Sequence, residues 1–183
     1  MLTKEQIDAH QLWLETRFSD APQGKRLVAR STNLAGADLT RANLAWADLD
    51  GANLADANLV DADLAGANLA RANFARADLT SADLSHANLA GAALPGANLT
   101  SVDLEGANLA GANLTDADLP GANLVGVDLE GANLARADLT DADLDGANFA
   151  DANLTGAKLP PIPYQPRAVR VSPSVSGAPT VAI

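Results

Sequence analysis

Residues 52–71 read ANLAD-ANLVD-ADLAG-ANLAR, four units of five residues with the same Ala and Leu in each. The unit Ala-(Asn/Asp)-Leu-x-x repeats without a slip, and every fifth residue from Leu34 to Leu159 is Leu except Phe74 and Phe149. Self-similarity at a fixed short period is typical of a solenoid, in which each repeat packs on its neighbours.

Two further positions of the unit are nearly fixed. Of 26 units, 23 have Ala two residues before the Leu or Phe, and the exceptions are Thr32, Val102 and Val127. The residue between them is Asn in 14 units and Asp in ten, with Ala93 and Lys158 as departures.

A five-residue period suits neither a helix nor a straight strand. A helix turns about 100° per residue, so each step would rotate the Leu by about 140° around the cylinder. A strand alternates its faces with period two, so successive Leu residues would point to opposite sides. The Leu and Ala positions can all be buried if a short extended segment is followed by a corner at the two x residues. The pattern therefore predicts an all-β solenoid with Leu and Ala inside.

The corners carry turn residues. The second x residue is Gly in 12 units, and Pro precedes Gly at Pro95-Gly96 and Pro120-Gly121, which is the signature of a type II turn. We expect corners without Gly, such as those at Arg76 and Arg136, to use another turn type.

Units such as Ala-Asn-Leu-Ala-Gly and Ala-Asp-Leu-Thr-Asp resemble the pentapeptide-repeat family, over 130 of the 183 residues. The resemblance implies a right-handed quadrilateral β-helix with four units per coil. The 26 units would then make about 6.5 coils and a rod of about 31 Å at the usual strand spacing.

Three segments are expected: an N-terminal capping helix and linker (1–26), the pentapeptide-repeat β-helix (27–161) and a Pro-rich C-terminal tail (162–183). Residues 3–18 predict one amphipathic helix, with Ile7, Leu14 and Phe18 on one face, that covers the first coil. Pro160 and Pro161 end the ladder because they lack N–H donors.

The tail leaves two readings open. Its composition is typical of a disordered segment. Alternatively, it folds over the last coil or docks on another chain, and the candidate contacts are Tyr164, Arg167, Val169, Arg170 and Val171.

The charge is distributed unevenly. Residues 32–161 carry 19 acidic and five basic side chains, a net charge of −14, while residues 162–183 carry two Arg and no acid. Sorted on the four implied sides, one side has a net charge of −6 with no Lys or Arg, and the others have 0, −4 and −4. That side is the candidate interaction surface, and its acids are Asp63, Asp83, Asp103, Glu105, Asp143 and Asp145. We expect no direct nucleic-acid binding, because phosphate contacts need Lys and Arg.

No pattern indicates catalysis or a bound cofactor. The ten Asp residues of the repeat alternate with Asn, which cannot act as a general base, so we expect a solvated or turn-bonding position. The chain has no Cys, and its two histidines, His10 and His86, have no nucleophile nearby in sequence. Phosphate-loop, nucleotide and triad signatures are absent from the sequence. We therefore predict a protein that is not an enzyme and has no catalytic, cofactor-binding or metal-binding residues.

The sequence also bears on location. No apolar run approaches the roughly 20 residues that span a bilayer, and the N-terminus lacks the order of a signal peptide. We expect a cytoplasmic protein without membrane contact, either a monomer or a homo-oligomer formed through the rod ends or the tail.

Three roles remain open. The first is a rigid structural or protein-interaction scaffold whose partner is unknown. The second, which the family resemblance implies, is a DNA mimic that modulates DNA gyrase or topoisomerase in quinolone resistance. DNA as long as the rod carries about 18 phosphate charges, comparable to the acid excess here. The third is a component of a phage virion or other assembly, anchored by the C-terminal tail.

Overall fold

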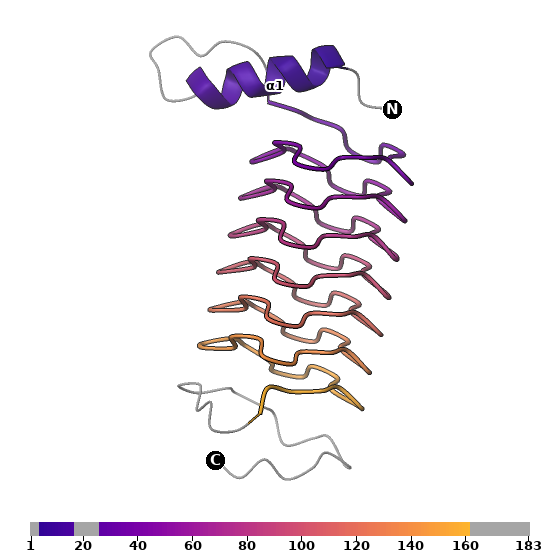
Figure 1. Ribbon diagram of the computed structural model, residues 1–183, viewed down its shortest axis with the longest axis vertical. Helices are drawn as coiled ribbons and strands as arrows, with labels where there is room; N and C mark the ends of the chain where they lie inside the picture. The colour runs from indigo at the N-terminus through magenta and orange to yellow at the C-terminus, as the bar shows by residue number, and fades with distance from the viewer. Residues whose placement is uncertain (1–3, 17–25, 162–183) are drawn as a thin grey trace.

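The structure, a computed structural model, describes residues 4–16 and 26–161. Residues 26–161 form a rod of stacked coils, and a single helix, α1 (Lys4–Thr16), lies across its N-terminal end (Figure 1). The rod is the right-handed quadrilateral β-helix that the repeat and its resemblance predict.

Parallel β-bridges set the length of each coil. Every bridge joins the middle residue of one unit to the middle residue of the fourth unit after it, from Val28 and Asp48 to Asp138 and Lys158. Each coil therefore has four sides, and each unit forms one of them. The bridges are single residues, and residues 26–161 contain no longer strand.

Backbone hydrogen bonds tie each unit to the coils on both sides. In mid-rod, the amide of Leu99 donates to the carbonyl of Asp118 at 2.6 Å, and the amide of Ser101 donates to that of Pro120 at 3.0 Å. The amide of Asp103 donates in the opposite direction, to Ala82, at 3.0 Å. Backbone groups of the sides are therefore paired along the rod, as a buried ladder requires.

The interior is filled by Leu and Ala in uniform layers. Leu99 is 0% exposed, and the two Phe residues that replace Leu, Phe74 and Phe149, are 0% and 2% exposed. Burial of the Ala and Leu positions is the main stabilising contribution, since transfer of apolar surface from water is worth about 25 cal/mol per Å².

The rod begins one unit earlier than the repeat pattern shows. Residues 27–31 form a first unit in which Leu27 and Ala29 are both buried and Val28 bridges to Asp48. Leu and Ala have exchanged places in this unit, so it lies outside the run of Leu at every fifth position that starts at Leu34.

A buried carboxylate ties this first unit to the coil below. Asp48 is 2% exposed and accepts hydrogen bonds from Arg30 Nε at 2.7 Å and from Asn68 Nδ2 at 3.0 Å. Burial raises the pKa of Asp48, but these hydrogen bonds outweigh it and hold the pKa below its ordinary value. Asp48 therefore stays ionised and paired at the start of the rod.

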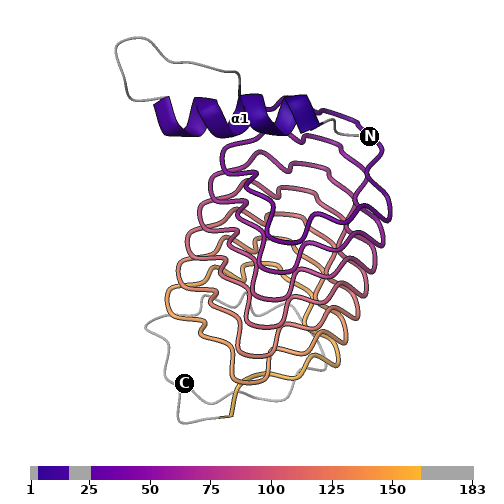
Figure 2. The same ribbon diagram turned by 45° about the horizontal axis from the view of Figure 1, so that its top comes forward.

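Helix α1 covers the open first coil, as predicted (Figure 2). His10, a residue of α1, is fully buried on the helix side that faces the rod. Its Nδ1 accepts a hydrogen bond from the amide of Leu27 at 3.0 Å, and its ring stacks on Trp13 with centroids 5.9 Å apart. His10 thus has a structural role at the junction between helix and rod. Of the predicted apolar face, Leu14 is half-buried, while Phe18 and the side chain of Ile7 lie outside the described residues.

The prediction of a different turn at corners without Gly is wrong. The second corner residues from Ser31 to Gly156, 26 in all, have positive φ between 51° and 72°, and 14 of them are not Gly. Arg76 has φ of 57°, its amide donates to the carbonyl of Pro95 at 3.0 Å, and the amide of Ala77 closes the turn on Phe74 at 3.0 Å. The stacked ladders impose one path on every corner and outweigh the cost of about 1–2 kcal/mol for a left-handed residue.

Candidate functional site

The Asn and Asp side chains at the middle of each unit brace the corner that follows. Their Oδ1 atom accepts the backbone N–H two residues later, as Asp83 does from Ser85 at 2.9 Å and Asn98 does from Thr100 at 3.1 Å. Either residue supplies this acceptor, which explains why Asn and Asp alternate freely. The expectation of a turn-bonding position is confirmed for nine of the ten Asp residues, which need no catalytic or metal-binding explanation; the tenth, Asp118, precedes Pro120 and has no N–H to accept.

Proline explains the departures from this rule. Ala93 and Lys158, the two middle residues that are neither Asn nor Asp, each come two residues before a Pro, at Pro95 and Pro160. A Pro has no N–H to donate, so no side-chain acceptor is needed there. Asp118 also comes two residues before a Pro, at Pro120, and keeps its carboxylate, so Pro permits a departure but does not require one.

Asn also joins one coil to the next. The Nδ2 of Asn53 donates to Asn33 Oδ1 at 3.1 Å and that of Asn73 donates to Asn53 at 3.0 Å. These bonds form a ladder of Asn side chains along that side, and Ala93 interrupts it. In each of these bonds the donor is the Asn of the later coil. An Asp at that position has no side-chain N–H to donate, so the residue one coil earlier receives no bond from it.

All five cations of residues 32–161 are held in ion pairs with acids of neighbouring coils. Four pairs have separations of 2.5–2.7 Å and that of Arg41 with Asp61 measures 3.4 Å. The other four are Arg71 with Asp50, Arg76 with Asp56, Arg136 with Asp116, and Lys158 with Asp138. None of these acids belongs to the predicted interaction surface.

The pair of Asp138 and Lys158 gives the rod a measurable acid sensitivity. Lys158 Nζ lies 2.7 Å from Asp138 Oδ2, and Thr140 donates its amide and hydroxyl to Oδ1 at 3.0 and 2.5 Å. These hydrogen bonds, that of Lys158 first, lower the pKa of Asp138 to about 2. Because the folded pKa lies below the unfolded value, the stability from this pair is present above about pH 4 and is lost as the pH falls towards 2.

We expect an NMR titration of the Asp138 carboxyl to show a midpoint near pH 2 in the native protein. In Lys158→Met the midpoint should move up towards the ordinary Asp value, while the bonds from Thr140 remain. Urea unfolding of the two proteins should differ most at pH 5 and converge at pH 2. Equal midpoints in both proteins would contradict the assigned cause.

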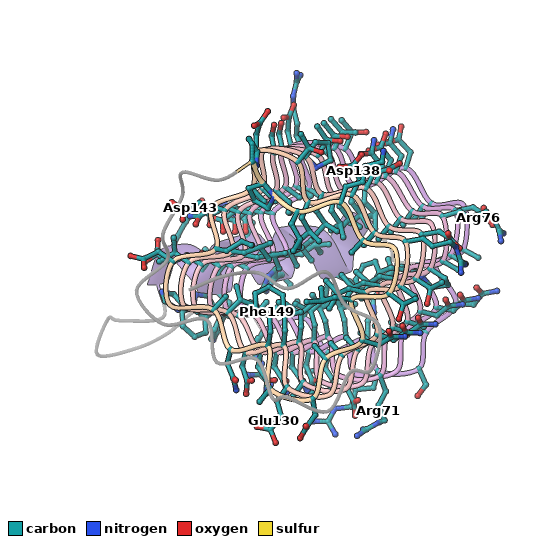
Figure 3. The ribbon with its side chains drawn as sticks, turned by 90° about the horizontal axis from the view of Figure 1, so that it is seen from below. Arg71, Arg76, Glu130, Asp138, Asp143 and Phe149 are labelled. Carbon is teal, nitrogen blue, oxygen red and sulfur yellow. The ribbon has the colours of Figure 1, made fainter. Side chains whose placement is uncertain are left out.

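The candidate acidic residues lie together on one side of the rod. We call this surface the acidic side; it comprises Asp63, Asp83, Asp103, Glu105, Asp143 and Asp145, with Asn43 and Asn123 in the same column. Bridges join Asp63 to Asp83 and Asp83 to Asp103, so three carboxylates stack in consecutive coils with a spacing of about 4.8 Å. Asp143 lies away from Arg76 and from Arg71, while Phe149 is inside (Figure 3).

Two aromatic side chains mark one edge of the acidic side. Trp46 is 46% exposed, and its ring lies where a Cβ on Gly66 would be only 2.8 Å away. His86, two coils later, lies in the same way over Gly106, with its Nδ1 2.6 Å from the equivalent point. Gly at 66 and 106 permits this close approach of each ring to the next coil's corner.

Asp83→Asn is expected to stabilise the rod by about 1 kcal/mol, because the introduced amide can donate to Asp63 and one stacked charge is removed. The geometry already exists further along the same column, where Asn123 Nδ2 donates to Asp103 Oδ1 at 3.0 Å. Urea unfolding at low and high salt measures the effect, and salt should reduce the charge contribution. Asn123→Asp is the matched control and should destabilise by a similar amount. A less stable Asp83→Asn protein would contradict the stacking.

Other kinds of site have little support in the described part of the chain. Across 4–16 and 26–161, no group of three His, Cys, Asp or Glu side chains is arranged to hold a metal ion. The described helix is too short and too polar to cross a membrane. The predicted tail contacts, Tyr164, Arg167, Val169, Arg170 and Val171, lie outside the described residues.

The sequence profile of the pentapeptide repeats matches this chain in eight copies, over residues 29–56, 57–94, 97–134 and 122–159. The chain belongs to the pentapeptide-repeat family. No curated protein matches this pentapeptide-repeat chain.

Several solved pentapeptide-repeat structures are similar to it. HetL, involved in heterocyst differentiation regulation in the cyanobacterium Nostoc sp. PCC 7120, is 28% identical over 80% of this chain and 91% of its own, with a TM-score of 0.32. Alr5209 of the same cyanobacterium is 41% identical over 48% of this chain and 64% of its own, with a TM-score of 0.36. QnrB1, a plasmid-mediated fluoroquinolone resistance protein, is 20% identical over 73% of this chain and 91% of its own, with a TM-score of 0.29. These TM-scores are too low to indicate what this chain binds.

Proposed function

We propose that this pentapeptide-repeat protein is a rigid, non-catalytic scaffold whose acidic side binds a basic surface of a partner protein. One observation carries the proposal. Every cation of residues 32–161 is paired with an acid elsewhere on the rod, while the acidic side carries six acids and no Lys or Arg. The net negative charge is therefore largest on the acidic side, at −6 against 0, −4 and −4 on the other sides.

The rigidity of the rod supports this role. The acidic residues at the middle positions are fixed by their hydrogen bonds to the corners, as Asp63 is by Ala65 at 3.1 Å and Asp103 is by Glu105 at 3.0 Å. A surface that is already ordered loses little conformational entropy on binding. Complementary charge then raises the rate of association and selects the partner. A nucleic acid would be repelled, which makes a basic protein surface the fitting partner.

The test compares two variants of equal charge. In the first, Asp63, Asp83 and Asp103 are changed to Asn; in the control, Asp118, Asp128 and Asp141 on other sides are changed to Asn. Immobilised rods are used to capture proteins from bacterial extract, and each captured protein is purified for titration. We expect the acidic-side variant to bind at least about tenfold more weakly and the control to bind nearly as tightly as the native rod. Equal binding by both variants would contradict the proposed surface.

The regular stack of Asp63, Asp83 and Asp103 favours a second candidate, a DNA mimic that acts on DNA gyrase. Its carboxylates repeat along one side, as phosphates do along a DNA strand. A gyrase supercoiling assay with the same two variants tests this candidate. Inhibition or protection that disappears only in the acidic-side variant would support mimicry. No effect of the native rod at tens of micromolar would leave the scaffold and exclude gyrase as its partner.

A further inference from the structure

Helix α1 meets the rod through a buried histidine. His10 is 0% exposed, and its Nδ1 accepts the amide of Leu27 at 3.0 Å. A neutral imidazole accepts at one nitrogen and carries its proton on the other, so this bond places the proton of His10 on Nε2. An imidazolium donates at both nitrogens and accepts at neither. The docked helix therefore requires a neutral His10.

Protonation of His10 would oppose docking in two ways. It would set an N–H of the ring against the amide of Leu27, so that the hydrogen bond is lost, and it would leave a positive charge in a site closed to water. The ring of Trp13 stacks on His10 with 12° between their planes. Both rings belong to α1, so a contact between Trp13 and the cation would persist after release and does not hold the helix to the rod.

The charged groups beside Leu27 add to this effect. Arg26 and Arg30 lie on either side of it in the chain, and both are held by Asp48, at 3.6 and 2.6 Å. The carboxylate of Asp48 is thus already shared between two cations. A protonated His10 would bring a third cation to the first unit without bringing another acid.

The remaining charged groups of the two described elements do not compensate. On the first coil, the carboxylate of Asp38 accepts the amide and hydroxyl of Thr40, and Arg41 pairs with Asp61. On α1, the charged residues all lie at least about 120° around the helix from His10, at about 100° per residue. They are Lys4, Glu5, Asp8 and Glu15.

Release of α1 would uncover the start of the core. Leu27 and Leu34 are 3% and 4% exposed, although no coil precedes them within the described residues. Helix α1 lies across this end of the rod (Figure 2). Since a solenoid needs a cap over its first coil, the helix controls access to this end.

We infer that His10 makes the N-terminal cap acid-sensitive: protonation of its ring releases α1 from the first coil while the coils themselves stay folded. The coils are held by backbone ladders and by Leu and Ala, which do not titrate. This inference does not depend on the proposed partner.

The sign and the size of the effect follow from proton linkage. The released helix binds the proton and the docked helix does not, so docking weakens as the pH falls through about 6.5, the ordinary value for His. One linked proton changes the docking equilibrium by about thirtyfold between pH 7.5 and 5.0. Carboxyl groups titrate at lower pH, and hydrogen bonds hold the pKa values of Asp38 and Asp48 below their ordinary range, so both stay ionised in this window.

Hydrogen exchange at the amide of Leu27 tests the inference, because this amide is the donor to His10. After correction for the intrinsic effect of pH on exchange, its protection should fall about thirtyfold from pH 7.5 to 5.0 in the full chain. The amide of Leu99, in mid-rod, should keep its protection. Unchanged protection at Leu27 would overturn the inference, and an equal loss at Leu99 would do so too, because the whole rod would then be unfolding.

The two histidines of the chain provide matched variants. His10→Asn cannot take up the proton but supplies an Oδ1 that can accept the amide of Leu27, so protection there should change less than about threefold over the same pH range. His86→Asn, at a corner of the acidic side, should keep the thirtyfold change. The opposite result for the two variants would assign the effect to His86 and overturn the inference.

An NMR titration of the His10 ring in the native protein keeps the test decisive if His10→Asn does not dock. Protonation of the ring and loss of protection at Leu27 should occur over the same pH range. A protonated His10 in a protein whose Leu27 amide remains protected would show that docking tolerates the imidazolium, and the inference would fail.

Discussion

Leu99→Ala is expected to lower the free energy of unfolding by about 2–5 kcal/mol, the range for truncation of a fully buried Leu. Leu99 is 0% exposed, and its layer is made of side chains no larger than Leu. The ladders on both sides fix the backbone, so the coil cannot collapse into the cavity. The cost should therefore fall in the upper part of the range, and urea unfolding measures it.

Leu159→Ala is the matched control, because it removes the same atoms at the same position of the repeat. Leu159 is 41% exposed, so most of the transfer and cavity cost is absent, and we expect a loss below about 1 kcal/mol. Equal losses for the two variants would contradict the inward assignment of Leu in mid-rod.

Ser101→Pro is expected to destabilise the rod by at least about 3 kcal/mol, because proline is incompatible with this corner in two ways. Ser101 has φ of 55°, whereas the proline ring fixes φ near −65°. The substitution also removes the N–H that donates to the carbonyl of Pro120 at 3.0 Å. Thermal and urea unfolding should both show the loss.

Ala110→Pro places the same residue at the other corner position and serves as the control. It would create a Pro-Gly corner with Gly111, like the native one at Pro95 and Gly96. Only the bond from the Ala110 amide to Asn108 Oδ1, 3.0 Å long, is lost, so a cost of about 1 kcal/mol is expected. A tolerated Ser101→Pro would mean that the ladder does not impose positive φ on corners without Gly.

The variants at Leu99 and Ser101 test one feature that the sequence predicted and one that it did not. The inward positions followed from the five-residue period alone, since neither a helix nor a straight strand could bury it. The corners at Arg76 and Arg136 were misjudged because local propensity disfavours positive φ outside Gly. Stacking against neighbouring corners decided their conformation, and such contacts join residues that lie almost a full coil apart in the chain.

The acidic side illustrates the same division. The sequence held the six acids, but they are spread from Asp63 to Asp145, and only a four-unit coil brings them to one surface. The family resemblance supplied that number of sides, and the bridges between equivalent units of successive coils establish it. The ion pairs could not be read from the five-residue repeat alone, because Arg71 pairs with Asp50, which lies more than a full coil earlier in the chain, at the corner of the same side in the coil before it.

The sequence by itself determined the solenoid, the Leu and Ala interior, the corner positions, the capping helix and the excess of acid. Each depends on local chemistry or on a short period that one unit already displays. The tertiary structure alone decided the exchange of Leu and Ala in the first unit, the common path of the corners and the pairing of every cation of residues 32–161. These depend on which residues meet when the chain closes a coil, and closure is set by the stacked ladders of the whole rod.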